Sequence, residues 1–187
     1  MAEIHHTTMA PTKLELLASW LPTRPWYAGH SASPRLMKAG GFRLDDPAGA
    51  VGIEFLVATD ESAAQVVSYL FPLSYRGEPL AGADHALIGT SEHGVLGTRW
   101  IYDGEHDPVL LEQLSALLAG KAEPQAQSVS DTPDPTVVVH AAREAGNAVR
   151  IARVLTAGGE EPSGAYVTAG WKLPDGSEIR GCFAFMH

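Results

Sequence analysis

The apolar positions at the start of the chain follow the period of a helix. They recur at i, i+3 and i+7, the spacing of one helical face, and are Leu14, Leu17 and Leu21. Thr12 and Glu15 have the spacing of a capping box, in which each side chain satisfies a backbone donor at a helix start. Pro22 cannot continue a helix. The pattern therefore predicts an amphipathic helix that begins after Thr12 and ends before Pro22.

The next part of the chain has the alternating pattern of strands. Residues 36–44 and 51–59 are separated by residues 45–49 (DDPAG), a strong turn sequence. In the second run, one set of alternate positions holds both polar and apolar residues. The other set is strongly apolar and consists of Val51, Ile53, Phe55 and Val57. This difference predicts a sheet that is covered mainly on one side.

Further strands are predicted at residues 65–75, 86–90 and 95–102. Pro72 has no backbone N–H to donate, so we expect it to place the end of the first of these strands at a sheet edge or a bulge. The short loop between the other two contains a glycine and has the length of a hairpin connection.

A second helix is predicted directly after these strands. Asp107 and Pro108 fit the N-cap and the first position of a helix. The buried stripe of this helix is rich in leucine and consists of Leu110, Leu111, Leu114, Leu117 and Leu118. Gly120 suits the position just past the helix end.

The composition changes after residue 120. Residues 121–135 are polar and contain three prolines, a composition typical of a linker. Short strands are then predicted at 136–140, 148–155, 165–172 and 177–185, the last two joined by an Asp-Gly hairpin turn. We therefore expect an α+β protein with a helix-backed, curved antiparallel sheet over residues 1–120. A linker over 121–135 and a small antiparallel β appendage over 136–187 would follow it.

The balance of charge restricts the class of partner. The chain has 187 residues, with 22 acidic and 13 basic side chains and a formal charge of −9. This argues against binding to nucleic acid or to an anionic membrane, because both require a basic face. The first eleven residues lack the pattern of a secretory signal, and no apolar run reaches the roughly 20 residues that cross a bilayer. We expect a cytoplasmic protein.

The segment between the first helix and the first strand concentrates unusual residues. Residues 21–29 (LPTRPWYAG) hold two prolines, one cation and two large aromatic side chains. Its main expected role is a rigid corner that closes over a core. Arg24, Trp26 and Tyr27 could also bind a ligand or a partner, since aromatic faces stack on sugar rings and arginine can stack on a ring or hold an anion.

The acidic turn before the second helix is another candidate. Asp103, Glu105, His106 and Asp107 are residue types that serve as general acid and base or bind a divalent cation. The alternative is a plain turn, because acidic side chains are favoured near a helix N-terminus. Asp103 and His106 are retained as candidate ligand- or partner-binding residues, and no residue is assigned a catalytic role.

The sequence contains no familiar metal or cofactor motif. His5 and His6 are adjacent and would point to opposite faces of a strand. Three other histidines fall in separate predicted loops without a cysteine partner, and these are His85, His93 and His106. Glycine-rich phosphate-binding motifs are missing. Cys182 is the single cysteine, which excludes an internal disulfide, and its predicted strand favours a core position. We expect neither a metal nor a cofactor.

Two of these segments resemble a known family. Residues 20–29 (WLPTRPWYAG) resemble the signature W-L-P-x-x-R-W-F-x-G-K of the N-terminal cap domain of actinobacterial maltokinases and related aminosugar kinases. Residues 102–103 (YD), followed by residues 106–108 (HDP) and the leucine-rich helix, resemble a later part of the same cap. His30 stands where the family usually has a lysine. The resemblance covers roughly residues 12–120 and implies a helix-backed, curved antiparallel sheet. In that family the cap precedes a two-lobed kinase core that phosphorylates maltose with ATP.

The resemblance implies a metabolic setting rather than a reaction. The sequence has no match to a kinase catalytic loop or metal-binding motif, and the residues after Gly120 are too few for two kinase lobes. We therefore expect a stand-alone, non-catalytic cap-like protein that acts as a binding or regulatory module in α-glucan, maltose or trehalose metabolism. Its expected partner is a maltokinase or another enzyme of that metabolism, and a saccharide is a candidate ligand.

Two other functions stay open at this point. A small hydrolase-like enzyme would use Asp103, His106 and Asp107 as acid and base, and would need these side chains to meet in one pocket. A structural protein would instead form a homo-oligomer through exposed edges of the C-terminal strands.

Overall fold

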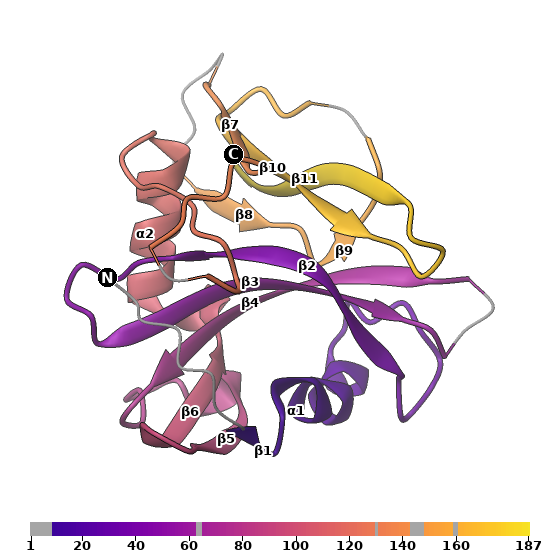
Figure 1. Cartoon of the computed structure of the whole chain (residues 1–187), viewed down its shortest axis with the longest axis vertical. Helices are drawn as coiled ribbons and strands as arrows, with labels where there is room; N and C mark the ends of the chain where they lie inside the picture. The colour runs from indigo at the N-terminus through magenta and orange to yellow at the C-terminus, as the bar shows by residue number, and fades with distance from the viewer. Residues whose placement is uncertain (1–8, 63–64, 130, 143–147, 159–160) are drawn as a thin grey trace.

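The fold is a large, curved antiparallel sheet flanked by two short α-helices (Figure 1). The computed structural model describes residues 9–62, 65–129, 131–142, 148–158 and 161–187. The helices are α1 (Lys13–Trp20) and α2 (Pro108–Leu118), and the 3-10 turns are η1 (Leu21–Thr23), η2 (Asp84–Ala86) and η3 (Gly104–His106). This arrangement confirms the predicted α+β class.

The strands are β1 (Met9–Ala10), β2 (Leu36–Leu44), β3 (Val51–Asp60), β4 (Val67–Arg76), β5 (Leu87–His93), β6 (Gly97–Asp103), β7 (Val138–His140), β8 (Val149–Ile151), β9 (Val154–Leu155), β10 (Tyr166–Lys172) and β11 (Glu178–Met186). Their order in the sheet is β1-β5-β6-β4-β3-β2-β10-β11-β8, with β7 beside β10 and β9 beside β4. The strands β2 to β4 and the two predicted hairpins, β5–β6 and β10–β11, are confirmed. The predicted strand 148–155 is divided into β8 and β9.

Both helices begin as their sequences indicate. The Thr12 hydroxyl accepts from the backbone N–H of Glu15, and the Glu15 carboxylate accepts from the N–H of Thr12. The Asp107 carboxylate accepts from the N–H of Val109 at the start of α2. Gly120 follows α2 with a φ of +68°, the left-handed conformation expected there. Neither described helix combines the length and apolar character that a bilayer-crossing helix requires.

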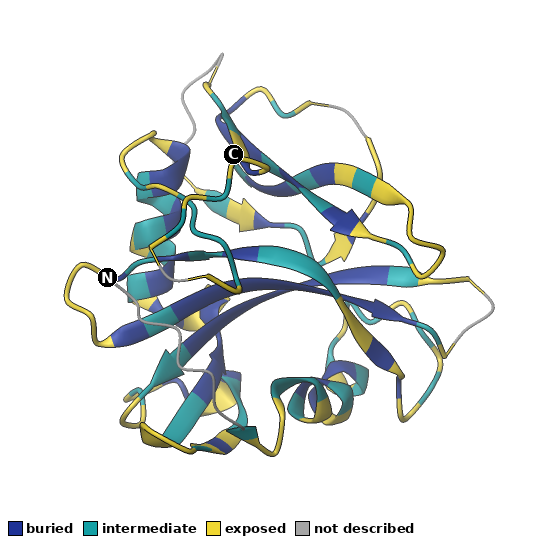
Figure 2. Cartoon of the chain, in the orientation of Figure 1, coloured by how far each residue is buried: buried dark blue, intermediate teal, exposed yellow. Residues whose placement is uncertain are grey.

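The central strand β3 is covered on both faces, so the expectation of a sheet covered mainly on one side is wrong (Figure 2). One face packs into a hydrophobic cluster with α2 and the C-terminal strands, and its β3 members are Val51, Ile53, Phe55 and Val57. We call it the α2 cluster. Leu56 and Ala58 face the opposite side and pack with α1 in a second cluster, the α1 cluster. The mixed alternation of β3 hid this, because Gly52 and Glu54 share that face with Leu56 and Ala58.

The C-terminal strands complete the α2 cluster. Phe183 of β11 is fully buried, with its ring centroid 6.1 Å from that of Phe42 in β2 and 6.0 Å from that of Trp171 in β10. Phe42 in turn stacks on Phe55 of β3 at 4.8 Å. The strands after residue 136 therefore share one hydrophobic core with β2 and β3.

A short segment also joins two distant parts of the sheet. Residues 149–151 pair with β11, and residues 154–155 pair with β4. Between them, Ala152 donates to Phe183 O, and Arg153 O accepts from Leu70 N. We call residues 149–155 the seam segment. The seam segment therefore connects β11 to β4, and the curved sheet surrounds the α2 cluster.

Pro72 lies inside the sheet rather than at an edge, which corrects the sequence expectation. It pairs with Phe55 in the ladder between β3 and β4. On the other side of β4, β9 pairs with Ser68 and Tyr69, and β6 pairs only from Leu73 onward. A residue without an N–H is tolerated here because Pro72 falls in the gap between these two ladders.

Residues 121–135, predicted as a linker, lie against β2. Gln125 and Arg43 exchange two backbone hydrogen bonds of 2.8 and 2.9 Å. The side chain of Gln127 donates to Glu54 Oε1 at 2.9 Å. The segment is irregular, as its composition indicates, but it contacts the sheet. The domain boundaries at 120 and 135 stay predictions.

Candidate functional site

The aromatic corner at residues 21–29 packs against the α1 cluster. Its arginine, Arg24, lies over the Trp20 ring with the guanidinium carbon 4.7 Å from the ring centroid. Arg24 Nη2 also donates to the Thr23 hydroxyl at 2.8 Å, and that hydroxyl donates to Trp20 O at 2.6 Å. Arg24 is half-buried. Arg24 thus helps to build the corner and still reaches the surface.

Trp26 is half-buried and is surrounded by other side chains. Its ring centroid lies 5.8 Å from that of Trp20, 6.1 Å from that of Tyr69 and 6.2 Å from that of Phe71. The guanidinium carbon of Arg153 lies 5.2 Å from the Trp26 ring centroid. A sugar platform needs an open ring face, so these contacts favour the packing role of Trp26.

Tyr27 fixes the loop that leads to β2. Its hydroxyl lies 3.1 Å from Ser31 O and 3.2 Å from a carboxylate oxygen of the buried Asp60. Burial and the Asp60 charge raise the pKa of Tyr27. A Cβ atom at Gly29 would meet the Tyr27 hydroxyl at 2.4 Å, so the glycine permits the loop to pass close to the ring. The Tyr27 hydroxyl is therefore engaged within the protein.

Arg153 of the seam segment connects the two sequence motifs. Its Nη2 donates to both carboxylate oxygens of Asp103, at 2.7 and 2.9 Å, and to Glu105. The same guanidinium lies over Trp26. Only 9% of the Arg153 side chain is exposed. The first motif, carrying Trp26, and the second motif, carrying Asp103, thus meet through a residue that lies outside both.

No sequence pattern indicated Arg153. It follows a short run of alternating residues and has no motif around it. Its importance arises from the seam segment, which passes between β11 and β4 only in the folded chain.

The acidic turn does not assemble an acid–base group. Asp103 pairs with Arg153, and Asp107 pairs with Arg76 through two bonds of 2.7 Å each. His106 is exposed and lies beside His85 instead. The three side chains required by the hydrolase alternative therefore have three different partners.

The pair between Asp107 and Arg76 has a completely buried carboxylate. The Asp107 side chain is 0% exposed and also caps α2. Burial alone would raise the pKa of the Asp107 carboxyl, but the hydrogen bonds and charge of Arg76 outweigh burial and lower it. The charged form of Asp107 is thus favoured in the folded protein, where it holds β4 to α2.

Glu54 forms a second buried network on the α1 side of β3. Its carboxylate accepts from Lys13 of α1 at 2.7 Å, from the Tyr75 hydroxyl at 2.5 Å and from Gln127 at 2.9 Å. Burial would raise the pKa of Glu54, but the charge and hydrogen bond of Lys13 outweigh it, and the pKa is lowered. Burial and the Glu54 charge raise the pKa of Tyr75 well above its usual value. This network joins α1, β4 and residues 121–135.

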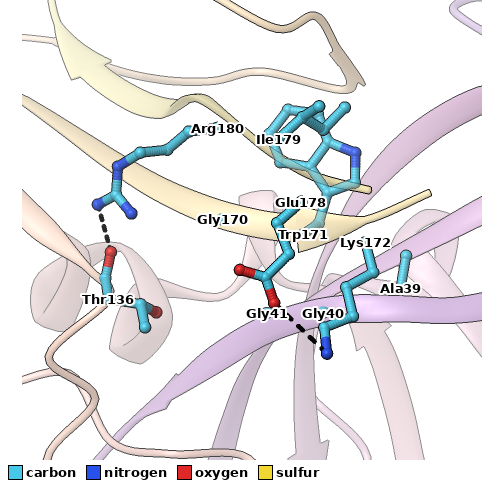
Figure 3. Close-up of a pocket in the computed structure, with 10 residues that line it drawn as sticks. All are labelled: Ala39, Gly40, Gly41, Thr136, Gly170, Trp171, Lys172, Glu178, Ile179 and Arg180. Atoms are coloured by element: carbon cyan, nitrogen blue, oxygen red, sulfur yellow. Dashed lines mark hydrogen bonds and ion pairs between the residues drawn. The ribbon is translucent and has the colours of Figure 1, made fainter. Parts of the chain in front are cut away.

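A pocket of about 360 Å³ opens between β2, β10 and β11 (Figure 3). Glycine backbone and a rim of charged side chains line it, and these residues include Gly40, Gly41, Gly170, Lys172, Glu178 and Arg180. Strands β2 and β10 pair only at Gly40 and Trp171, so they diverge beside the pocket. The Trp171 ring is buried and donates to Ser68, which turns it toward the core. No sequence motif indicated this pocket.

The charged rim of the pocket is partly paired. Lys172 Nζ lies 3.4 Å from Glu178 Oε1, and both side chains are well exposed. The Arg180 guanidinium donates to Thr136 O on the opposite side of the pocket (Figure 3). Because Gly170 has no side chain, the floor between Arg180 and the Lys172–Glu178 pair is open. These groups can bind hydroxyl or anionic oxygen atoms.

The part of the chain that the structure describes contains no group of three or more His, Cys, Asp or Glu side chains arranged to hold a metal ion. His5 and His6 lie outside the described residues. Cys182, which was expected in the core, is half-buried in β11, and burial raises the pKa of its thiol.

The family comparison covers both motifs. Residues 20–107 match the maltokinase N-terminal cap domain, a little under half of the chain. The match begins at the last residue of α1 and ends at the N-cap of α2, so it includes the aromatic corner, β2 to β6 and the acidic turn. A comparison with curated proteins yields no match. Residues 20–107 are thus similar to the maltokinase N-terminal cap domain, and this similarity supports a link to maltose and trehalose metabolism.

Proposed function

We propose that the protein is a non-catalytic cap module that binds, in trans, a maltokinase or another enzyme of α-glucan, maltose or trehalose metabolism. The observation that carries this proposal is the cap-family match over residues 20–107. Other segments of the same chain cover both faces of the sheet that these residues form. Helix α1 closes one face, while α2 and the C-terminal strands close the other. A cap closed in this way does not need a second protein to cover its core, and it can therefore act as a separate partner.

We place the contact surface at the aromatic corner and the acidic turn. Arg24, Trp26 and Tyr27 lie together on the α1 cluster, and Arg153 connects them to Asp103. His106 is exposed on the acidic turn, three residues after Asp103. Half-buried aromatic and arginine side chains that are already held in place cost little entropy when a partner binds them, which is why such residues are frequent at the centres of interfaces.

The test is calorimetry and pull-down with the maltokinase of the same organism. We expect binding that Arg24→Ala weakens at least tenfold, since this side chain reaches the surface without entering the core. Arg150→Ala is the matched control, because Arg150 is an exposed arginine of β8, a strand at the far end of the sheet order, and its loss should leave binding unchanged. If the kinase does not bind at concentrations near millimolar, or if both variants weaken binding equally, the proposal fails.

We also propose the pocket between β2, β10 and β11 as the place where a saccharide would bind. Its volume of about 360 Å³ lies in the range of small-molecule sites. Glu178, Lys172 and Arg180 can form directional hydrogen bonds to sugar hydroxyls, whereas the ring of Trp26 is occupied by its neighbours.

The saccharide proposal is tested by titrating the protein with malto-oligosaccharides. Arg180→Ala and Glu178→Gln should each abolish the heat of binding, and Trp26→Phe should leave it intact. Loss of binding in the Trp26 variant alone would assign the sugar to the corner instead. An absence of any heat for the unmodified protein would remove the saccharide from the proposal without affecting the kinase test.

A further inference from the structure

Two exposed histidines lie side by side on adjoining turns of the cap. His85 belongs to η2 and His106 to η3, which are 21 residues apart in the chain. The Nε2 atom of His85 lies 3.3 Å from the Nδ1 atom of His106. The two rings are nearly perpendicular, with an interplanar angle of 80° and centroids 4.7 Å apart. The contact between the two rings is therefore made by one nitrogen atom of each ring.

Both turns are held by buried neighbours, so the pair does not depend on two freely moving side chains. Ala83 and Ala86, on either side of His85, are buried and pack with Tyr102. On the other turn, Asp107 follows His106 and is fixed by its ion pair with Arg76. The two backbones thus keep the imidazoles at a set separation.

The separation of the two nitrogens is that of two ligands of one metal ion. Nitrogen ligands about 2.0–2.1 Å from a tetrahedral zinc ion are about 3.3–3.4 Å apart. Without an ion the two nitrogens are joined by a hydrogen bond, which at 3.3 Å is slightly longer than the usual range of about 2.7–3.2 Å. Imidazole is also a preferred ligand of Zn²⁺, Ni²⁺ and Cu²⁺.

We propose that His85 and His106 form a site for a divalent transition-metal ion of the Zn²⁺ class, bound through His85 Nε2 and His106 Nδ1. The described residues supply only these two ligands, since no third His, Cys, Asp or Glu joins them. Water fills the remaining positions, which the exposure of both rings allows. A bound ion would fasten η2 to η3, the turn that carries the acidic motif and leads into α2.

The experiment uses the untagged full chain and zinc chloride as the probe. Calorimetry should show one ion bound per chain, and magnesium chloride should show none, because Mg²⁺ prefers oxygen ligands. His85→Ala and His106→Ala should each remove this isotherm. Both residues are exposed on the surface, and circular dichroism should confirm that each variant keeps its fold.

Two matched controls separate this site from other histidines. His30→Ala, at another exposed histidine, and the double variant His5→Ala/His6→Ala should bind zinc as the unmodified chain does. Long-range ¹H–¹⁵N spectra should show that zinc shifts one nitrogen of each ring, at His85 and at His106. Zinc binding that persists in His85→Ala, or that disappears with His5 and His6, would overturn the proposal. An unmodified chain that binds no zinc would show that the two rings are only hydrogen-bonded neighbours.

Discussion

The two faces of strands β2 to β4 are closed by segments of different origin. The α1 face is covered by one continuous stretch, in which α1 leads directly into the aromatic corner. The α2 face is covered by α2 and by strands that come from widely separated parts of residues 137–184. Its rings and aliphatic side chains are almost all fully buried, whereas the corner rings of Trp26 and Tyr27 are half-buried.

The α1 face is thus partly a surface, whereas the α2 face is a closed core. The α1 face presents an arginine and partly exposed rings, and Arg24 and Trp26 lie where a partner can reach them. On the α2 face the seam segment pairs with β4, and the core side chains of that face are buried. We infer that the α1 face is the one available for binding, while the C-terminal strands provide the stability that this face requires.

The largest expected effect comes from removing the C-terminal strands. A chain that ends after Gly120 would expose the β2 and β3 side of the α2 cluster, including Phe42 and Phe55, which are 0% exposed in the full chain. We expect this truncated chain to lose cooperative unfolding in urea, monitored by circular dichroism. A sharp transition at the midpoint of the full chain would show that residues 1–120 fold alone and that the two faces are independent.

Single substitutions should show the same asymmetry between the faces. Phe183→Ala removes a fully buried ring from the α2 cluster and should cost about 3–5 kcal/mol of unfolding free energy. Trp26→Ala removes a half-buried ring from the α1 side and should cost about 1.5–3 kcal/mol. Urea unfolding of both variants measures the difference, and an equal or reversed order would contradict the distinction between core and surface.

The ion pair that holds α2 to β4 predicts a pH effect. The pKa of Asp107 is lowered in the folded protein, so the folded state binds fewer protons than the unfolded state. Its contribution to stability is complete above the unfolded pKa of about 3.9 and is lost as the pH falls through the lower folded value. Asp107→Asn should therefore be less stable at pH 7 and should lose less stability on acidification. The same acid dependence in both proteins would contradict this role.

The smallest expected effect concerns the contact between the two faces. Arg153 lies over Trp26 and pairs with Asp103, so it joins the seam segment to the corner. A double-mutant cycle of Arg153→Lys and Trp26→Phe should give a coupling energy of about 0.5–2 kcal/mol. Lysine keeps the charge but loses the planar fork. A cycle between Arg150→Lys and Trp26→Phe is the control and should give no coupling.

The parts of the structure that follow local rules could be predicted from the sequence. The capping box at Thr12, the Asp-Pro start of α2 and the Asp-Gly hairpin between β10 and β11 depend on residues close together in the chain. The family resemblance also came from local segments. Its cap assignment is confirmed by the match over residues 20–107.

The parts that depend on long-range contacts could not be predicted. Neither Arg153 nor the pocket beside Gly170 has a motif, because each arises where segments far apart in the chain meet. The prediction that Pro72 lies at a sheet edge or a bulge was wrong for the same reason. Pro72 is tolerated inside the sheet because neither β6 nor β9 pairs with it on one side of β4. The pairing of His85 with His106 depends in turn on how η2 packs against η3.

The central claim is that the cap strands and the C-terminal strands form one cooperative unit. Native-state hydrogen exchange of the full chain tests it most directly, since it gives an opening free energy for each strand. We predict that slowly exchanging amides of β10 and β11 open with the same free energy as those of β3 and β4, and that urea lowers both in parallel. If β10 and β11 instead open first, with a lower free energy and while β3 and β4 stay protected, the C-terminal strands are a separate unit and the account is wrong.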